Sequence, residues 1–156
     1  MRRDFAKLVY EEMKVNQDIY VITGDLGYGL WDKVKEDFPS RFYNVGSSEM
    51  AMMGMGVGLA MDGKIPYIYS ITPFVLYRPF EMIRNYLDHE KIPVNLIGGG
   101  RDKDYGYLGF THWAEEDMSI LFSQYFVVVM QTPTFTVLLC TRGGLLPLCS
   151  DDSQLA

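Results

Sequence analysis

Cysteine and histidine are scarce in this sequence, which limits the metal and redox chemistry that the chain can offer. Its 156 residues include two cysteines, Cys140 and Cys149, and two histidines. The cysteines have no second pair and no histidine at the spacing of metal ligands, so we expect no metal site in the chain. The simplest interpretation is a pair of free thiols in the reducing cytosol, and therefore a cytoplasmic protein.

Basic charge and long apolar runs are also lacking. The chain carries 14 Lys+Arg against 20 Asp+Glu, for a formal net charge of -6. A surface that neutralises phosphates needs the opposite balance, so nucleic acid is not an expected partner. No apolar run approaches the roughly 20 residues of a membrane span, and the N-terminal residues are amphipathic where a signal peptide would be apolar. We therefore expect no membrane association.

What the sequence does contain is a regular alternation of strand-like and helix-like segments. Ile19 to Thr23, for example, is a short β-branched run, which is typical of a parallel strand buried on both faces. Helices are expected over residues 4–15, 30–37, 49–61, 78–89 and 114–122, and strands over 19–23, 42–45, 66–70, 93–97 and 126–130, with a last strand within 132–140. This alternation predicts an α/β fold, a parallel sheet flanked by helices, with ligands bound beyond the carboxyl ends of the strands.

The loops that directly follow predicted strands are thus the candidate sites, and Glu49 stands out among them. It begins a helix whose next residues are almost all apolar or glycine. Such a helix is expected to be buried, and Gly54 and Gly58, one turn apart, would let another backbone approach, as in a subunit interface. On position alone, Glu49 is either an acid that the helix dipole stabilises, or a buried acid that can hydrogen-bond a ring nitrogen.

Several separated motifs occur in one order along the chain. They are Gly24-Asp25-Leu26, Arg41-Phe42 to Gly46-Ser47-Ser48-Glu49, Gly58-Leu59-Ala60, Gly63 with Pro66, Gly106 to His112, and Glu116-Asp117. Together they resemble the pyrimidine-binding domain of the transketolase family, and several motifs in register make a chance match improbable. The resemblance implies a thiamine-diphosphate-binding (Pyr domain) fold over residues 1–130, followed by a last strand and an atypical tail over residues 131–156.

The resemblance also implies roles for four residues. Glu49 is expected to be catalytic, because the matching glutamate protonates the ring nitrogen of the aminopyrimidine of thiamine diphosphate. Phe74 matches the aromatic residue that stacks on this ring, and Asp25 lies in the first cofactor-binding loop. His112 matches a catalytic histidine that faces the substrate. A departure lies just before it, since residues 107–110 replace an acidic residue and a Gly-Pro pair, which leaves the substrate open.

No glycine loop with an acidic ligand could hold magnesium and a diphosphate group in this chain. The resemblance therefore implies a partner chain with a diphosphate-binding (PP) domain that carries Mg²⁺ and shares the thiamine diphosphate. This chain would form a homodimer within a larger complex, a heterotetramer. The expected reaction is the transfer of a two-carbon ketol unit between sugar phosphates. The alternatives are deoxyxylulose-phosphate synthase, a 2-oxo acid decarboxylase or dehydrogenase subunit, and a non-catalytic assembly paralogue.

Overall fold

The computed structural model describes residues 2–122, 127–132 and 135–139. Its helices are α1 (Arg2–Val15), α2 (Asp32–Asp37), α3 (Glu49–Met61), α4 (Thr72–Tyr77), α5 (Phe80–Met82), the π-helix η2 (Ile83–His89) and α6 (Asp117–Phe122). The strands are β1 (Ile19–Thr23), β2 (Phe42–Asn44), β3 (Ile65–Ile71), β4 (Asn95–Gly99), β5 (Val127–Thr132) and β6 (Phe135–Leu139). Short 3-10 turns are η1 (Pro39–Arg41), η3 (Gly106–Leu108) and η4 (Phe110–His112).

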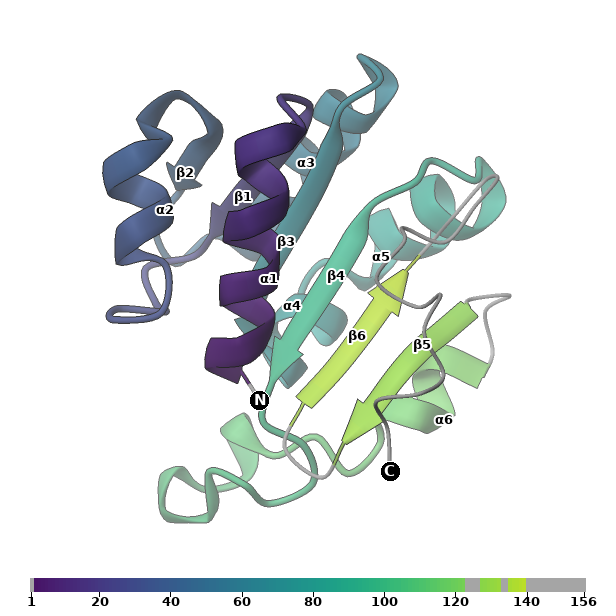
Figure 1. Ribbon diagram of the computed structural model, residues 1–156. Coiled ribbons are helices and arrows are strands. Elements are labelled where there is room, and N and C mark those ends of the chain that lie inside the picture. Colours follow the sequence, from purple (N-terminus) through teal and green to yellow (C-terminus); the bar gives the residue numbers. More distant parts are fainter. Residues whose placement is uncertain (1, 123–126, 133–134, 140–156) are drawn as a thin grey trace, which may run out of the picture.

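The strands form one sheet in the order β2-β1-β3-β4-β6-β5 (Figure 1). The first four strands run parallel, with Val21 of β1 opposite Tyr67 of β3, and Tyr69 opposite Ile97 of β4. Strand β6 runs antiparallel to both β4 and β5. The predicted parallel sheet with flanking helices is therefore confirmed for these four strands. The carboxyl ends of β1, β3 and β4 lie along one edge, which we call the site edge.

Helices cover both faces of the sheet, and alternate strand residues pack under each (Figure 1). On one face, α1 packs on Val21, Tyr67 and Ile97. On the other, α3 and the helices after β3 pack on the neighbours of these residues, among them Ile68 and Leu96. This double burial explains why the strands are continuously apolar in sequence, without the alternation of a half-exposed strand.

Helix α3 packs on β3 through Gly56. A Cβ atom on Gly56 would lie 2.5 Å from Cδ1 of Ile68, so a larger residue fits only if the Ile68 side chain or the helix moves. The two glycines singled out from the sequence behave differently. A Cβ on Gly54 would meet only the end of Met82 at 3.9 Å, and a Cβ on Gly58 would meet nothing within 4 Å. In this chain they line an open face of α3.

The prediction of a single helix over residues 78–89 is wrong in its start and its form. The chain turns helical already at Thr72, because Pro73 in the first turn of α4 needs no hydrogen-bonded N–H there. Pro79 then separates α4 from α5, and the segment continues as the π-helix η2. Phe74 therefore lies on a helix and not in a loop.

The last strand departs from the predicted parallel sheet. Only residues 133 and 134 separate β5 from β6, and a parallel connection needs a dozen or more residues, so β6 has to turn back. Predicted helices 30–37 and 114–122 are shorter than expected and begin at Asp32 and Asp117. Cys140, Cys149 and the tail from residue 140 onward lie outside the described residues. Within the described part, none of the helices has the length and apolar character needed to cross a bilayer.

Candidate functional site

Glu49 is the first residue of α3, and its side chain is buried at the site edge with 4% of its surface exposed. The loop before it comes close to the end of β1. A Cβ on Gly24 would lie 3.0 Å from the carbonyl oxygen of Gly46 and 3.9 Å from Oε1 of Glu49. Position 24 is therefore tight against the Gly46 carbonyl, whereas a Cβ there would make only an ordinary van der Waals contact with the carboxylate.

Arg78 is the partner of this carboxylate, and sequence reasoning missed it. Its Nη1 donates a hydrogen bond to Oε2 of Glu49 at 2.9 Å. The central carbon of the same guanidinium lies 3.7 Å from the centre of the Phe74 ring. Phe74 and Arg78 are four residues apart, so α4 places them on one side. That spacing could have suggested the contact with Phe74, whereas the contact with Glu49 depends on the fold.

His112 joins this cluster from the loop after β4. Its ring meets the Phe74 ring edge to face, with centroids 5.0 Å apart. The ring of Tyr105 is also near, with its centroid 6.3 Å from that of His112. His112 Nδ1 is 2.9 Å from the hydroxyl oxygen of Thr111, which fixes the orientation of the imidazole. The structure thus brings three predicted residues, Glu49, Phe74 and His112, into one series of contacts through Arg78.

Asp25 lies at the same edge but takes no part in that series. It follows Gly24 in a left-handed conformation with φ 51°. Its backbone N–H donates to Asn44 Oδ1 at 2.8 Å, and its carboxylate accepts a short hydrogen bond from the hydroxyl of Tyr28. In the described residues these contacts hold the loop after β1, and none of them reaches Phe74 or His112.

The segment from Arg101 to Asp117, which we call the His112 loop, is closed at its base by an ion pair. Arg101 donates two hydrogen bonds to the fully buried carboxylate of Asp117, at 2.7 and 3.0 Å. The hydrogen bond with Asp117 raises the pKa of Arg101 above its usual value. A backbone bridge joins Asp102 and Ala114, between the two residues of this pair. His112 is therefore presented by a loop with a fixed base.

The helix α4 is tied to the His112 loop by Tyr77. The Tyr77 hydroxyl donates to Glu116 Oε2 at 3.2 Å. Burial, and then the nearby Glu116 charge, raises the pKa of the Tyr77 phenol, so the hydroxyl keeps its proton. The other histidine, His89, is 83% exposed at the end of η2, as expected for a solvated residue.

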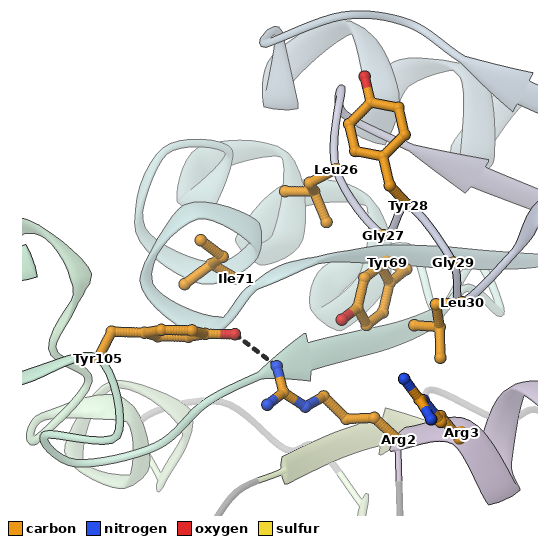
Figure 2. A pocket seen from close by; sticks show the side chains of 10 residues that line it. All are labelled: Arg2, Arg3, Leu26, Gly27, Tyr28, Gly29, Leu30, Tyr69, Ile71 and Tyr105. Atoms are coloured by element: carbon orange, nitrogen blue, oxygen red, sulfur yellow. Dashed lines mark hydrogen bonds between the residues drawn. The ribbon is translucent and has the colours of Figure 1, made fainter.

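A second feature missed from the sequence is a cavity of about 390 Å³ on the α1 side of the site edge. It is lined by Arg2, Arg3, Leu26, Gly27, Tyr28, Gly29, Leu30, Tyr69, Ile71 and Tyr105, and we call it the arginine pocket. Figure 2 shows Arg2 reaching toward Tyr105, to whose hydroxyl it donates a hydrogen bond at 2.6 Å. Two guanidinium groups beside a glycine loop suit a small anion.

Tyr105 connects this pocket with the Glu49 cluster. Its hydroxyl accepts the hydrogen bond from Arg2, while its ring contacts His112. Within the described residues, no group of three His, Cys, Asp or Glu side chains is placed to hold a metal ion. The site edge thus carries a buried acid, a flat aromatic face, an imidazole and a cationic pocket.

Comparisons with known proteins show which family the chain resembles as a whole. Residues 1–132 match the family described as the transketolase, pyrimidine binding domain. A putative transketolase C-terminal section of Methanocaldococcus jannaschii is 32% identical over 122 residues, which are 78% of this chain and 39% of that protein. One of the apulose-4-phosphate transketolase subunits of Phocaeicola vulgatus is 29% identical over 122 residues, which are 77% of this chain and 39% of that protein.

Among solved structures, a split gene transketolase described as an inactive beta4 tetramer is similar in fold and sequence. The TM-score is 0.63 at 30% identity, over 75% of this chain and 37% of that one. The chain thus spans about two fifths of the length of these relatives.

Proposed function

Because the chain belongs to the transketolase family, through its pyrimidine-binding domain, we propose that it supplies the pyrimidine-binding half of a thiamine-diphosphate site. A partner chain would supply the diphosphate-binding half with its Mg²⁺. The assembled enzyme would transfer a two-carbon ketol unit between sugar phosphates. The observation that carries this proposal is the buried carboxylate of Glu49, which one planar group, the Arg78 guanidinium, joins to the face of Phe74.

These residues fit the aminopyrimidine of the cofactor. A flat, cationic N–C–N group, the guanidinium of Arg78, already lies against Phe74 and bonds to Glu49. An aminopyrimidine has the same flatness and can present an N–H to the same carboxylate. When bound, thiamine diphosphate would supply the carbon nucleophile that the twenty standard side chains lack.

In this proposal, Glu49 and His112 handle protons on either side of the reacting centre. Glu49 would hold and exchange a proton at the pyrimidine ring nitrogen, a role for which burial and a fixed helix start are suited. His112, oriented by Thr111 at 2.9 Å, would use Nε2 to donate a hydrogen bond to an oxygen of the substrate. Phe74 would hold the pyrimidine ring flat and exclude water from its face.

The arginine pocket supports a phosphorylated substrate. The pocket lies at the same edge as Glu49, and Tyr105 links it to His112, since its hydroxyl bonds to Arg2 and its ring contacts the imidazole. A sugar that is anchored at His112 could therefore reach Arg2 and Arg3 with a terminal anionic group. The relative from Phocaeicola vulgatus is named for a sugar phosphate, apulose 4-phosphate.

The names of two relatives support the need for a partner chain. One relative is named as a C-terminal section of a transketolase and another as a transketolase subunit, so each is described as part of a larger enzyme. Self-association is supported by α3, which exposes Met50, Met55 and Met61 beside Gly54 and Gly58. We propose that this open face joins two copies of the chain, and that two partner chains complete a heterotetramer.

The test is a titration of thiamine diphosphate and Mg²⁺ into the chain alone and into its mixture with a diphosphate-binding transketolase chain. We expect cofactor affinity to rise by about tenfold or more in the mixture, because both halves then contribute contacts. Ketol transfer between sugar phosphates should appear only in the mixture. Unchanged affinity would contradict the shared site, and turnover of pyruvate with an aldose phosphate would favour deoxyxylulose-phosphate synthase instead.

A further inference from the structure

Arg78 fills the corner between Glu49 and Phe74 that the proposed function gives to the cofactor ring. Its guanidinium carbon lies 3.7 Å from the Phe74 ring centre, which is stacking distance. Its Nη1 bonds to the buried carboxylate at 2.9 Å. No second flat group can enter between two planes at this separation. The aminopyrimidine and the Arg78 guanidinium therefore exclude each other from this face of Phe74.

The two groups are also alike in what they offer the site. A guanidinium is planar, spreads its charge over an N–C–N unit and donates N–H bonds from its edge. A protonated aminopyrimidine is planar, contains an N–C–N unit and presents an N–H at its edge. Both can thus stack on Phe74 and donate to Oε2 of Glu49 at the same time.

We propose that Arg78 is an internal occupant of the aminopyrimidine site, which thiamine diphosphate has to displace in order to bind. This inference rests on the proposed function. While the cofactor is away, Arg78 spares Glu49 the cost of a buried charge without a counterion. Its own side chain is 47% exposed, so it can swing into solvent by rotation of its long stem without movement of α4.

The consequence is a lowered apparent affinity for the cofactor. Only molecules whose Arg78 side chain has moved into solvent can accept the ring. The apparent dissociation constant is therefore the intrinsic one divided by the fraction of molecules in that state. Removing the guanidinium should therefore strengthen binding of the pyrimidine part. An ordinary binding residue would show the opposite effect, because its removal weakens binding.

The experiment uses thiamine, which carries the aminopyrimidine without the diphosphate, titrated into the full chain and followed by NMR. We expect Arg78→Ala to bind thiamine about fivefold or more tightly than the wild type, since the occupied fraction is abolished. Arg84→Ala is the matched control, because Arg84 is exposed on η2 outside the site and its loss should leave the affinity unchanged. In the Glu49→Gln background, Arg78→Ala should bring a smaller gain, because the neutral amide holds the guanidinium less strongly than the carboxylate does.

Arg78→Lys covers the case in which Arg78→Ala does not fold. Lysine keeps the positive charge beside Glu49 but has no plane to stack on Phe74, so a smaller gain is expected. If the folded Arg78 variants bind thiamine no more tightly than the wild type, this inference is overturned while the proposed function stands. If no variant binds thiamine, and the wild type takes up no thiamine diphosphate even with the partner chain, the proposed function fails and this inference with it.

Discussion

Phe74 and His112 meet edge to face, with ring centroids 5.0 Å apart and planes inclined at 64°. Phe74 lies on α4 after β3, and His112 lies on the loop after β4, so two paired parallel strands deliver the two rings to one place. The cofactor wall and the substrate wall of the proposed site are thus in direct contact. Displacement of the His112 loop would therefore also change the packing around the Phe74 ring.

We expect Glu49→Gln, in the complex with the diphosphate-binding chain, to keep the fold and most cofactor affinity while turnover falls by on the order of 10²-fold or more. The amide keeps the shape and one hydrogen bond but cannot exchange the proton. The measurement is the rate at which the thiazolium C2 proton exchanges for deuterium, read by NMR after acid quench. Glu36→Gln on the exposed side of α2 is the matched control. Wild-type exchange in Glu49→Gln would refute the catalytic role and favour a helix-dipole role.

Asp117→Ala should destabilise the chain by about 3–5 kcal/mol, because the largely buried Arg101 loses the carboxylate that neutralises it. Chemical denaturation of the two proteins measures this difference. The same loop provides a control in Glu115, whose ion pair with Lys103 is about half exposed on both sides. Glu115→Ala should cost at most about 1 kcal/mol. Similar losses of stability in the two variants would mean that the buried Arg101–Asp117 pair contributes no more to the fold than the exposed pair does.

Arg2→Gln tests the arginine pocket. We expect the KM for a sugar phosphate to rise by about tenfold in the reconstituted enzyme, because a charge-assisted contact is lost, with little change in thiamine-diphosphate affinity. Tyr105→Phe removes only the hydroxyl that receives the hydrogen bond of Arg2 at 2.6 Å, and should cause a smaller rise. An equal loss of affinity for a substrate without phosphate would show that Arg2 acts on the sugar and not on the anion.

Gly58→Leu should prevent self-association through α3 without unfolding the chain, since a Cβ at this position meets nothing within 4 Å of its own chain. Sedimentation velocity measures the oligomeric state. Lys35→Leu adds the same side chain to the exposed face of α2 and should leave assembly intact. A wild type that is monomeric at all accessible concentrations, or a dimer that tolerates Gly58→Leu, would exclude this face as the interface.

The sequence was sufficient to predict the central elements because local signals agree there with the tertiary structure. The β-branched run Ile19–Thr23 and the helix Glu49–Met61 were predicted at their observed bounds. Phe74 was predicted as a cofactor contact from its place after a strand, and the structure puts it on a helix that was not predicted, against Arg78 and His112. Pro73 was taken as part of a loop, although proline is well tolerated in a first helical turn.

Features that join distant segments could not be predicted in this way. Arg78 meets Glu49 only because α4 and the start of α3 lie beside each other at the site edge. The arginine pocket requires the first turn of α1, the loop after β1 and Tyr105 to converge, and no periodicity along the chain encodes that. The reversed direction of β6 follows from a connection length whose effect becomes evident once both strand boundaries are known.

The close contact between Gly56 and Ile68 has a consequence for chemistry two helical turns away. Helix α3 rests against β3 at the depth that a hydrogen atom at position 56 permits, and Glu49 is the first residue of that same rigid rod. A methyl group in place of this hydrogen would force the Ile68 side chain to repack or α3 to shift, and a shift of α3 would carry Glu49 with it. The position of the Glu49 carboxylate therefore depends on an apolar contact in the core that involves neither Glu49 nor a bound ring.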